Sequence, residues 1–359
     1  MGGLAGHMMH PHDNLEMKVR EFKDLVRKTL RGELTMTEKI DGFNIHYLNY
    51  NGHLRLARNN NDLRNGGFSR TDIITRFDSS RVVDIFTLAY DLIEAEGSWK
   101  NLPNFKDCPV TINAEVVREG VTNIMWYSES KIYKHSIYYW QVNEVGGYEL
   151  KHIDTFPANG VQYTPISEKI VDDLIDGLAH QLFYQYGLND ENTILDHYKV
   201  IFAQVMEFYY KDYVVLDPKI LGVIFNRFFG QDKTNLREIR KMAKLDIQPI
   251  LDDEKFIMGS TKSFMDITVL GLGSKLLNRV EGINAQAGYQ YNAAAEMEYN
   301  INNALARVSE DKKGAFERRW NACNRKIYGI EGVVVKYNGQ LYKWTGPFAP
   351  INQLIGGNH

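Results

Sequence analysis

Residues Thr37–Asn44 read TEKIDGFN, and the chain continues with IHYLNYNGHLRLARN. Residues 34–40 and 43–50 predict β-strands, because apolar, aromatic and β-branched side chains recur there between turn residues. The Asn51-Gly52 dipeptide predicts a tight hairpin, since both residues tolerate the positive φ that a type I′ turn needs. A partner strand over residues 53–58 follows. The stretch therefore predicts an antiparallel hairpin, with Lys39 on the strand that leads into it.

The remainder of the first half mixes helices and strands. Apolar residues at helical spacing predict helices over residues 14–30 and 80–95. Residues 110–117 and 136–145 are rich in β-branched and aromatic side chains and predict strands.

The residue pattern changes after Pro165, and helical spacing of apolar residues dominates residues 165–325. Strand character returns at Tyr328, with a second Asn-Gly turn at Asn338. The sequence thus predicts an α+β fold of antiparallel sheets with helices, plus a large, mostly α-helical insertion. Residues 10–164 and 326–359 are expected to form one domain around that insertion, and residues 1–9 resemble a cloning remnant.

Composition excludes several classes of protein. The formal net charge of the 359 residues is −3, so contact with a nucleic acid would depend on local basic patches. Cys108 and Cys323 have no paired spacing, which argues against a disulfide framework or a zinc site and favours a reducing cytoplasm. No apolar run approaches the roughly 20 residues that span a bilayer, so no membrane association is expected.

Taken alone, the K-x-D-G pattern at Lys39 is weak, and a solvated strand-edge lysine is the commoner interpretation. Four further segments follow it in order, largely on predicted strands: ARN around Arg58, TINAEVV around Glu115, IEGVVVKY at 330–337 and LYKW at 341–344. This ordered set resembles the motifs of the covalent nucleotidyltransferase superfamily, which contains ATP-dependent DNA ligases, RNA ligases and mRNA capping enzymes. The resemblance covers the parts that flank the helical insertion, about half of the chain.

The resemblance implies a nucleotidyltransferase fold, an ATP-grasp-like ligase domain, and a chemistry centred on Lys39. In the family this lysine attacks the α-phosphate of ATP, forming a lysyl-nucleotide and releasing pyrophosphate. Such a lysine must lose its proton, against an ordinary pKa of about 10.4, and nearby cations and desolvation can lower that pKa. Glu38, Asp41, Gly42 and Asn44 complete the motif and are expected to line the nucleotide site.

The other matched residues are expected to bind the nucleotide or its metal. Arg58 would contact the nucleotide or the incoming end, and Glu115 would bind the ribose hydroxyls. Lys336 and Lys343 would contact phosphate. Trp140, in the YYW run with Tyr138 and Tyr139, is the aromatic expected to stack on the base.

The metal implied by the resemblance is Mg²⁺, because phosphoryl transfer needs its negative charge neutralised. Glu331 is its expected ligand. Lys336 would point to the opposite face of the strand, since side chains alternate.

Three positions bear on the match. Thr345 stands where the family has a second lysine after Lys343, so another cation would have to compensate. Asn113 stands where many members have an aspartate. Asn44 favours the RNA-ligase branch that includes bacteriophage and RNA-editing enzymes, because DNA ligases usually have arginine at that position.

The leading interpretation is an ATP- and Mg²⁺-dependent polynucleotide ligase that joins 5′-phosphate and 3′-hydroxyl ends, with RNA favoured. The alternatives are an ATP-dependent DNA ligase and a catalytically inactive end-binding protein of the same fold. The helical insertion is a candidate for gripping the nucleic acid. Its basic runs REIRKMAK at 237–244 and ERRWNACNRK at 317–326 are candidate phosphate contacts, the second with Trp320 beside the charges.

Overall fold

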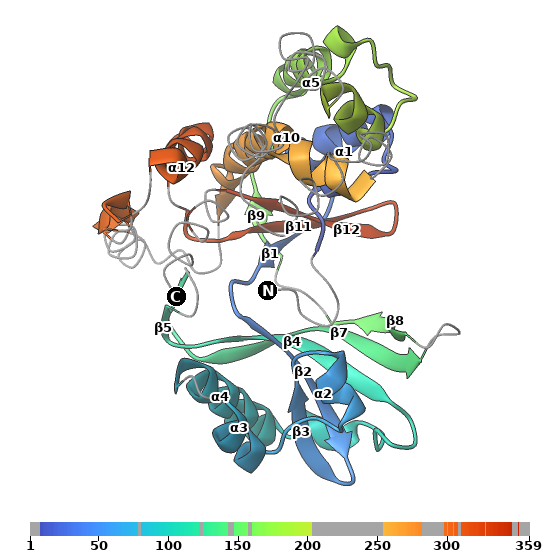
Figure 1. Ribbon diagram of the computed structural model, residues 1–359, viewed down its shortest axis with the longest axis vertical. Coiled ribbons are helices and arrows are strands. Elements are labelled where there is room, and N and C mark those ends of the chain that lie inside the picture. The colour runs from blue at the N-terminus through green and yellow to red at the C-terminus, as the bar shows by residue number, and fades with distance from the viewer. Residues whose placement is uncertain are drawn as a thin grey trace, which may run out of the picture.

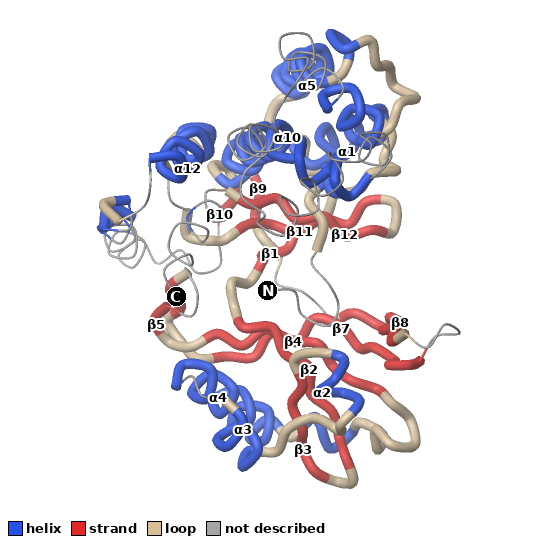
Figure 2. The backbone as a smooth tube through the Cα atoms, in the orientation of Figure 1, coloured by secondary structure: helices blue, strands red, loops and turns tan. Residues whose placement is uncertain are grey.

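The computed structural model describes residues 8–77, 80–121, 125–142, 147–156, 160–202, 254–281, 298–299, 301–303, 305–307, 310–326, 328–346 and 351. The basic run at 237–244 lies outside these residues. The fold is α+β with antiparallel sheets, as the sequence predicts. Two layers of strands lie in the middle, and helices cover their outer sides (Figure 1, Figure 2).

The first layer is a five-stranded sheet in the order β3-β2-β4-β7-β8. Its strands are β2 (Phe43–Tyr50), β3 (His53–Ala57), β4 (Val110–Val117), β7 (Lys131–Val142) and β8 (Tyr148–Thr155). The expected hairpin is confirmed, with φ of 54° at Asn51 and 77° at Gly52. β7 begins five residues before the predicted Ser136, because lysines and a register shift near Asn113 hide the alternation there.

Helices α3 (Arg70–Arg76) and α4 (Ser80–Glu96) cover one face of this sheet (Figure 1). The side chains that form this core alternate along the strands, as a half-buried sheet requires. They include Ile45, Tyr47, Leu54, Leu56, Ile112, Ala114 and Val116 from the sheet, with Phe86, Ala89 and Ile93 from α4. Asn44, His46, Asn113 and Glu115 therefore belong to the opposite face, which is the face toward the second layer.

The second layer is a three-stranded sheet in the order β1-β11-β12. Its strands are β1 (Met36–Lys39), β11 (Gly332–Tyr337) and β12 (Gln340–Thr345). The register pairs Lys39 with Gly332 and Gly332 with Thr345. The start and the end of the chain thus form one sheet, and β11 and β12 are joined by the second Asn-Gly turn, where Asn338 has φ of 48°.

Helices α1 (Val19–Leu30), α5 (Glu168–Leu182) and α10 (Glu254–Leu277) lie over the outer face of this second sheet (Figure 1). α1 begins later than the predicted residue 14, because the N–H of Lys18 donates to Glu21 Oε2 at 2.9 Å and caps the helix there. The shared core contains Phe22, Leu25, Val26, Leu30, Val171, Ile175, Met265, Val269, Leu272, Leu276, Val333, Val335, Tyr342 and Trp344. The described helices of the insertion therefore extend the core of the second sheet.

A smaller core lies where the two layers meet. Its members come from the Lys39–Asn44 connection, from the end of β4 and from α12 (Glu310–Ala322): Ile40, Val117, Met125, Tyr127, Phe316 and Trp320 are among them. Short elements complete the described fold: η1 (Pro11–Asp13), α2 (Asn60–Arg64), η2 (Ser98–Asn101), β5 (Gly120–Val121), β6 (Trp126–Tyr127), β9 (Gln162–Tyr163), η3 (Tyr184–Tyr186) and β10 (Val280–Glu281). None of the helices described has both the length and the apolar character needed to cross a bilayer.

The close packing of α10 on β12 can be tested by adding a side-chain atom at the point of contact. A Cβ at Gly273 would lie 2.2 Å from the carbonyl oxygen of Thr345, which is backbone and cannot move aside. We expect Gly273→Ala to lower the free energy of unfolding by about 3 kcal/mol or more, because overpacking at backbone is not relieved by a side-chain shift. Chemical denaturation measures this change.

Gly271→Ala on the same helix is the matched control. Among the described residues, its Cβ would meet only the carbonyl oxygen of Ala322, at 3.6 Å, which is an ordinary contact. The substitution is expected to be neutral or mildly stabilising, because alanine favours a helix over glycine by about 1 kcal/mol. Equal losses in the two variants would show that the close approach of α10 to β12 does not constrain the fold.

Candidate active site

The ion pair between Lys39 and Glu331 is the centre of the site. Lys39 is the last residue of β1, and Glu331 lies in the bend directly before Gly332, which pairs with Lys39 in the sheet. The Lys39 Nζ donates a short hydrogen bond to Glu331 Oε2. Two residues far apart in the sequence are therefore brought together by strand pairing, as the ordered motifs predict.

The carboxylates near Lys39 keep its amine protonated. Burial lowers the pKa of Lys39, but Glu331, Glu115 and Asp41 together outweigh burial, and the pKa lies above its usual value. Nearby cations are expected from the sequence to lower the pKa of Lys39. The neighbours that influence its pKa most are instead carboxylates, which raise it. Burial also raises the pKa of Glu331, and it raises that of Glu115 to about 7. Three carboxyl groups, of Glu331, Glu115 and Asp41, thus lie around the single positive charge of Lys39.

Glu115 lies opposite Asn44 in the pairing of β2 with β4. The amide of Asn44 donates to Glu115 Oε1 at 3.4 Å, and the amide of Asn113 donates to Asn44 Oδ1 at 3.1 Å. Glu115 Oε2 is buried and has no hydrogen-bond partner among the described residues. Asn113, whose role the sequence left open, therefore holds Asn44 against Glu115, and one carboxylate oxygen remains for a ligand.

Gly42 is needed for a close approach, and the group it approaches is Glu115. A Cβ at position 42 would lie 2.8 Å from both Glu115 Oε2 and the carbonyl oxygen of Val116. Asp41, beside it, is tied to the loop before β6. Its Oδ2 accepts the N–H of Met125 at 2.7 Å, and its own N–H donates to the Tyr127 hydroxyl at 2.7 Å. These contacts fix the path of the chain between the two sheets.

Arg58 follows β3. Its guanidinium lies 4.9 Å from the centre of the Phe43 ring, and its backbone N–H donates to Asp62 Oδ2 at 2.9 Å. Phe43 packs against Phe86 of α4, so this ring contact lies by the face of the sheet opposite to Asn44 and Glu115.

Trp140 is not brought to Lys39. On β7 the residue that pairs with Glu115 is Tyr133, which is roughly 20 Å along the strand from Trp140. Trp140 instead stacks on Tyr148 at 5.1 Å and donates through Nε1 to Asn60 at 3.2 Å.

Tyr138 lies nearer on the same strand. Its ring is tilted against buried His46 at 6.0 Å on the polar face of the sheet. Of the YYW run, Tyr138 is therefore better placed than Trp140 to meet a base.

Lys343 shares the face of Lys39 in the second sheet, because Thr37, Val334 and Lys343 are paired across it. Burial and the nearby Lys39 lower its pKa. Lys336 is on this same face, but it is exposed and further from Gly332. Glu331 lies in the bend before β11, so the alternation of the strand starts only at Gly332. Thr345 is buried in β12.

Sequence reasoning missed a second group of charged residues beside Lys343. It comprises His10, His12, Asp13, Lys262, Asp266 and Arg319, from the N-terminal segment, α10 and α12. Asp13 forms an ion pair with Lys262, and His12 Nε2 lies 2.7 Å from Asp266 Oδ1. No sequence motif marks these residues, because Asp13 and His12 are far along the chain from their partners Lys262 and Asp266.

The basic run at 317–326 differs from its expected role. Trp320 is buried and stacks on Phe316 at 5.8 Å, and the guanidinium of Arg325 donates to Glu317 at 2.6 Å. The aromatic ring belongs to the core between the layers, because α12 turns it inward, and it does not lie on the surface beside the charges.

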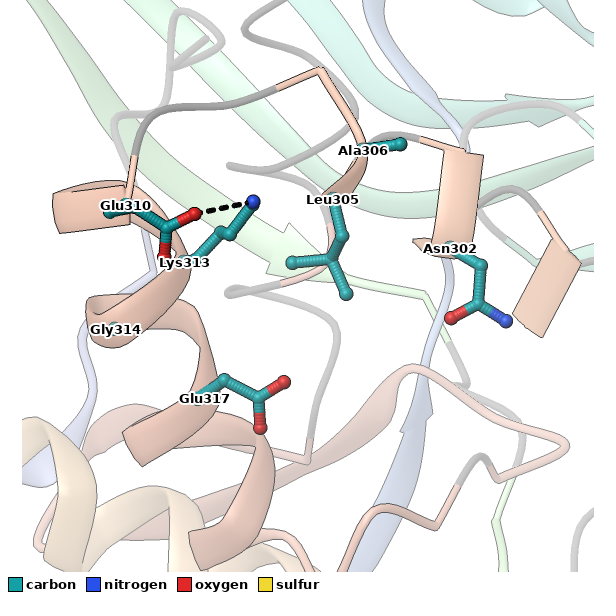
Figure 3. Close-up of a pocket in the computed structure, with 7 residues that line it drawn as sticks. All are labelled: Asn302, Leu305, Ala306, Glu310, Lys313, Gly314 and Glu317. Atoms are coloured by element: carbon teal, nitrogen blue, oxygen red, sulfur yellow. Dashed lines mark hydrogen bonds and ion pairs between the residues drawn. The ribbon is translucent and has the colours of Figure 1, made fainter.

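A surface pocket lies beside α12. It is lined by Asn302, Leu305, Ala306, Glu310, Lys313, Gly314 and Glu317 (Figure 3). Glu310 and Lys313 pair with each other at 2.7 Å across its rim. Its lining holds none of the motif residues.

Within the described ranges, no group of three or more His, Cys, Asp or Glu side chains is assembled as a metal site. Glu331 and Glu115 are nonetheless close enough for each to interact electrostatically with Lys39, and Glu331 raises the pKa of Glu115. Comparison with protein-family models, with curated proteins and with solved structures finds no match to this chain. The geometry and chemistry of its residues thus carry the functional argument.

Glu38, also expected at the nucleotide, gives a pH-dependent test of the site's stability. It alternates with Lys39 on β1, is 7% exposed, and burial raises its pKa to about 7 from about 4.5. A carboxyl with a raised pKa stabilises the fold while protonated, and this contribution is lost as the pH rises through about 7. The gap corresponds to about 3 kcal/mol.

We therefore expect Glu38→Gln to be nearly as stable as the native chain at pH 5 and up to about 3 kcal/mol more stable at pH 8. Denaturant unfolding at pH 5, 6, 7 and 8 measures the difference. Exposed Glu94→Gln serves as control and should show little change with pH. A difference for Glu38→Gln that is constant over this range would contradict the buried, protonated carboxyl.

Proposed function

We propose that this chain is an ATP- and Mg²⁺-dependent polynucleotide ligase of the covalent nucleotidyltransferase type, with RNA as the favoured substrate and Lys39 as the residue that carries AMP. One observation carries the proposal: Lys39, Glu331, Glu115 and Lys343 come from separate segments and converge where the two sheets face each other. These are the residues that the ordered motifs select. Chance resemblance of short motifs would not require their side chains to meet.

The residues present fit a nucleoside triphosphate. Two amines, of Lys39 and Lys343, lie on one face of the second sheet, and a buried Glu115 oxygen without a described partner can accept a ribose hydroxyl. The missing Cβ of Gly42 leaves the approach to Glu115 open. The polar face of the first sheet, with His46 and Tyr138, continues away from Glu115 and suits a base.

The carboxylates also fit Mg²⁺, which proteins usually hold through one or two carboxylates together with substrate phosphates. Glu331 would be its protein ligand. Mg²⁺ would supply positive charge to the phosphate oxygens and to this carboxylate. With Glu331 neutralised in this way, burial would weigh more on the pKa of Lys39 and would favour the uncharged amine that a nucleophile requires.

The reaction then follows from the positions of the amines. The lone pair of Lys39 Nζ forms a bond to the α-phosphorus, the bond from that phosphorus to the bridging oxygen breaks, and pyrophosphate leaves with the electron pair. Lys343 stabilises the charge on the α-phosphate. In the second step AMP is transferred from Lys39 to the 5′-phosphate of a strand. In the third step a 3′-hydroxyl attacks that phosphate, AMP leaves, and the strands are joined.

Asn44 supports RNA over DNA only through its place in the motif. Its hydrogen bonds to Glu115 and Asn113 give it a role in positioning the ribose-binding carboxylate. A DNA ligase and an end-binding protein without catalysis remain the alternatives, the second because Thr345 replaces a lysine.

Covalent labelling tests the proposal. With Mg²⁺ and ATP labelled at the α-phosphate, we expect a labelled chain that survives denaturation and is absent from Lys39→Ala and Lys39→Arg. The arginine variant keeps the charge beside Glu331 but cannot become a neutral nucleophile, so it separates loss of chemistry from loss of fold. Exposed Lys169→Ala on α5 should label like the native chain.

The remaining outcomes select other functions. Label from GTP alone would indicate a capping enzyme, and absence of label from every nucleotide would indicate a binding protein. If the chain is labelled, joining assays on nicked RNA, nicked DNA and single strands identify the substrate, with RNA expected to be joined faster.

A further inference from the structure

Lys343 has a second set of neighbours on the side away from Lys39. Residues 8–13 run beside β12: the N–H of Lys343 donates to the carbonyl of Met9 at 2.9 Å, and Met9 forms a bridge with Tyr342. His10 therefore follows directly beside Lys343. The N-terminal segment extends the second sheet at the edge where the amine of Lys343 emerges.

Two helices of the insertion bring further charges to this segment. Lys262 of α10 is paired with Asp13, whose Oδ2 also accepts the N–H of His10 at 2.8 Å. Asp266, one turn further along α10, accepts from His12 at 2.7 Å and lies 3.8 Å from Arg319 of α12. Charged side chains of the N-terminal segment and of α10 thus lie beside His10 and Lys343, each cation paired with an aspartate.

Burial and neighbouring cations act together on His10 and Lys343, in contrast to the carboxylates around Lys39. Burial, His12, Lys343 and Lys262 all lower the pKa of His10, which falls to about 3. Burial, Lys39 and Lys262 lower that of Lys343. His10 Nδ1 is buried without a hydrogen-bond partner in the described part of the chain. A bound anion would satisfy this nitrogen and relieve the repulsion.

We propose that Lys262, Lys343 and His10 form the subsite for pyrophosphate, the leaving group of nucleotide transfer. The inference rests on the proposed function. In-line displacement places the leaving group opposite the attacking amine across the α-phosphorus. In the sheet, Lys39 of β1 lies on one side of Lys343, and the N-terminal segment with His10 lies on the other. An α-phosphate held by Lys343 and attacked by Lys39 would direct its leaving group toward His10 and Lys262.

The subsite also bears on the lysine missing at position 345. Thr345 is buried, and its backbone packs against Gly273 of α10. Lys262 of that same helix supplies a cation in place of the missing lysine. Asp13 holds Lys262 in place and must release it to the incoming phosphates, so Asp13 competes with the ligand.

Direct binding of inorganic pyrophosphate, measured by calorimetry in the presence of Mg²⁺, tests the subsite without requiring catalysis. Lys262→Gln should weaken binding at least about tenfold, because it removes a charge-assisted hydrogen bond to the anion. Asp13→Asn should strengthen binding, since it removes the competing carboxylate. Lys275→Gln, exposed on the same helix, is the matched control and should bind like the native chain.

The opposite response of the two partners separates ligand binding from structural support. Equal weakening in Lys262→Gln and Asp13→Asn would mean that the pair only maintains the fold, and it would overturn the subsite. Unchanged binding in Lys262→Gln would do the same.

A catalytic measurement distinguishes pyrophosphate from the phosphate of a strand end. In the labelled chain, Lys262→Gln should raise the KM for pyrophosphate in the release of ATP by about tenfold or more. Its effect on joining a pre-adenylylated strand should be much smaller. A larger effect on joining would assign these cations to the nucleic acid and overturn the inference.

Failure of the proposed function has a different signature. A native chain that takes no label from ATP contradicts the ligase, whereas its binding of pyrophosphate through Lys262 would still support the anion subsite. If the chain is labelled but Lys262→Gln binds pyrophosphate as tightly as the native chain, the subsite is contradicted and the ligase proposal is not.

Discussion

The pairing of β1 with β11 is the constraint on which the rest of the structure depends. It places Lys39 beside Glu331 and unites the start and the end of the chain in one sheet. Because a shift of one residue in this register would turn Lys39 to the opposite face, the core of α1, α5 and α10 also fixes the side on which the amine lies. Chemistry and packing are thus set by the same strand register.

Two electrostatic regions meet at Lys343. On one side, Glu331, Glu115 and Asp41 hold a proton on Lys39, and on the other, Lys262 and His12 repel a proton from His10. Buried charge of one sign is costly unless it is paired or bound to a ligand. A triphosphate with a divalent cation carries both signs and would complement both regions, which is the physical basis of the two proposals.

The helical insertion has a second role that its composition did not suggest. α10 packs so closely on β12 that position 273 has no space for a Cβ, and α12 closes the junction between the sheets. These helices support the sheet, and α10 contributes Lys262 to the surroundings of Lys343. Its use in gripping a nucleic acid stays a prediction.

The local pattern determined the hairpins, the α+β class and the ordered motif residues, because turn chemistry and side-chain alternation act over a few neighbouring residues. The same pattern did not show that Trp140 lies far along β7 from Glu115, because the strand pairing fixes that distance. Only the tertiary structure decided that Asn113 supports Asn44, and that Lys262, Asp13 and His10 meet beside Lys343. Those contacts join residues of different segments, and no local signal in the sequence encodes them.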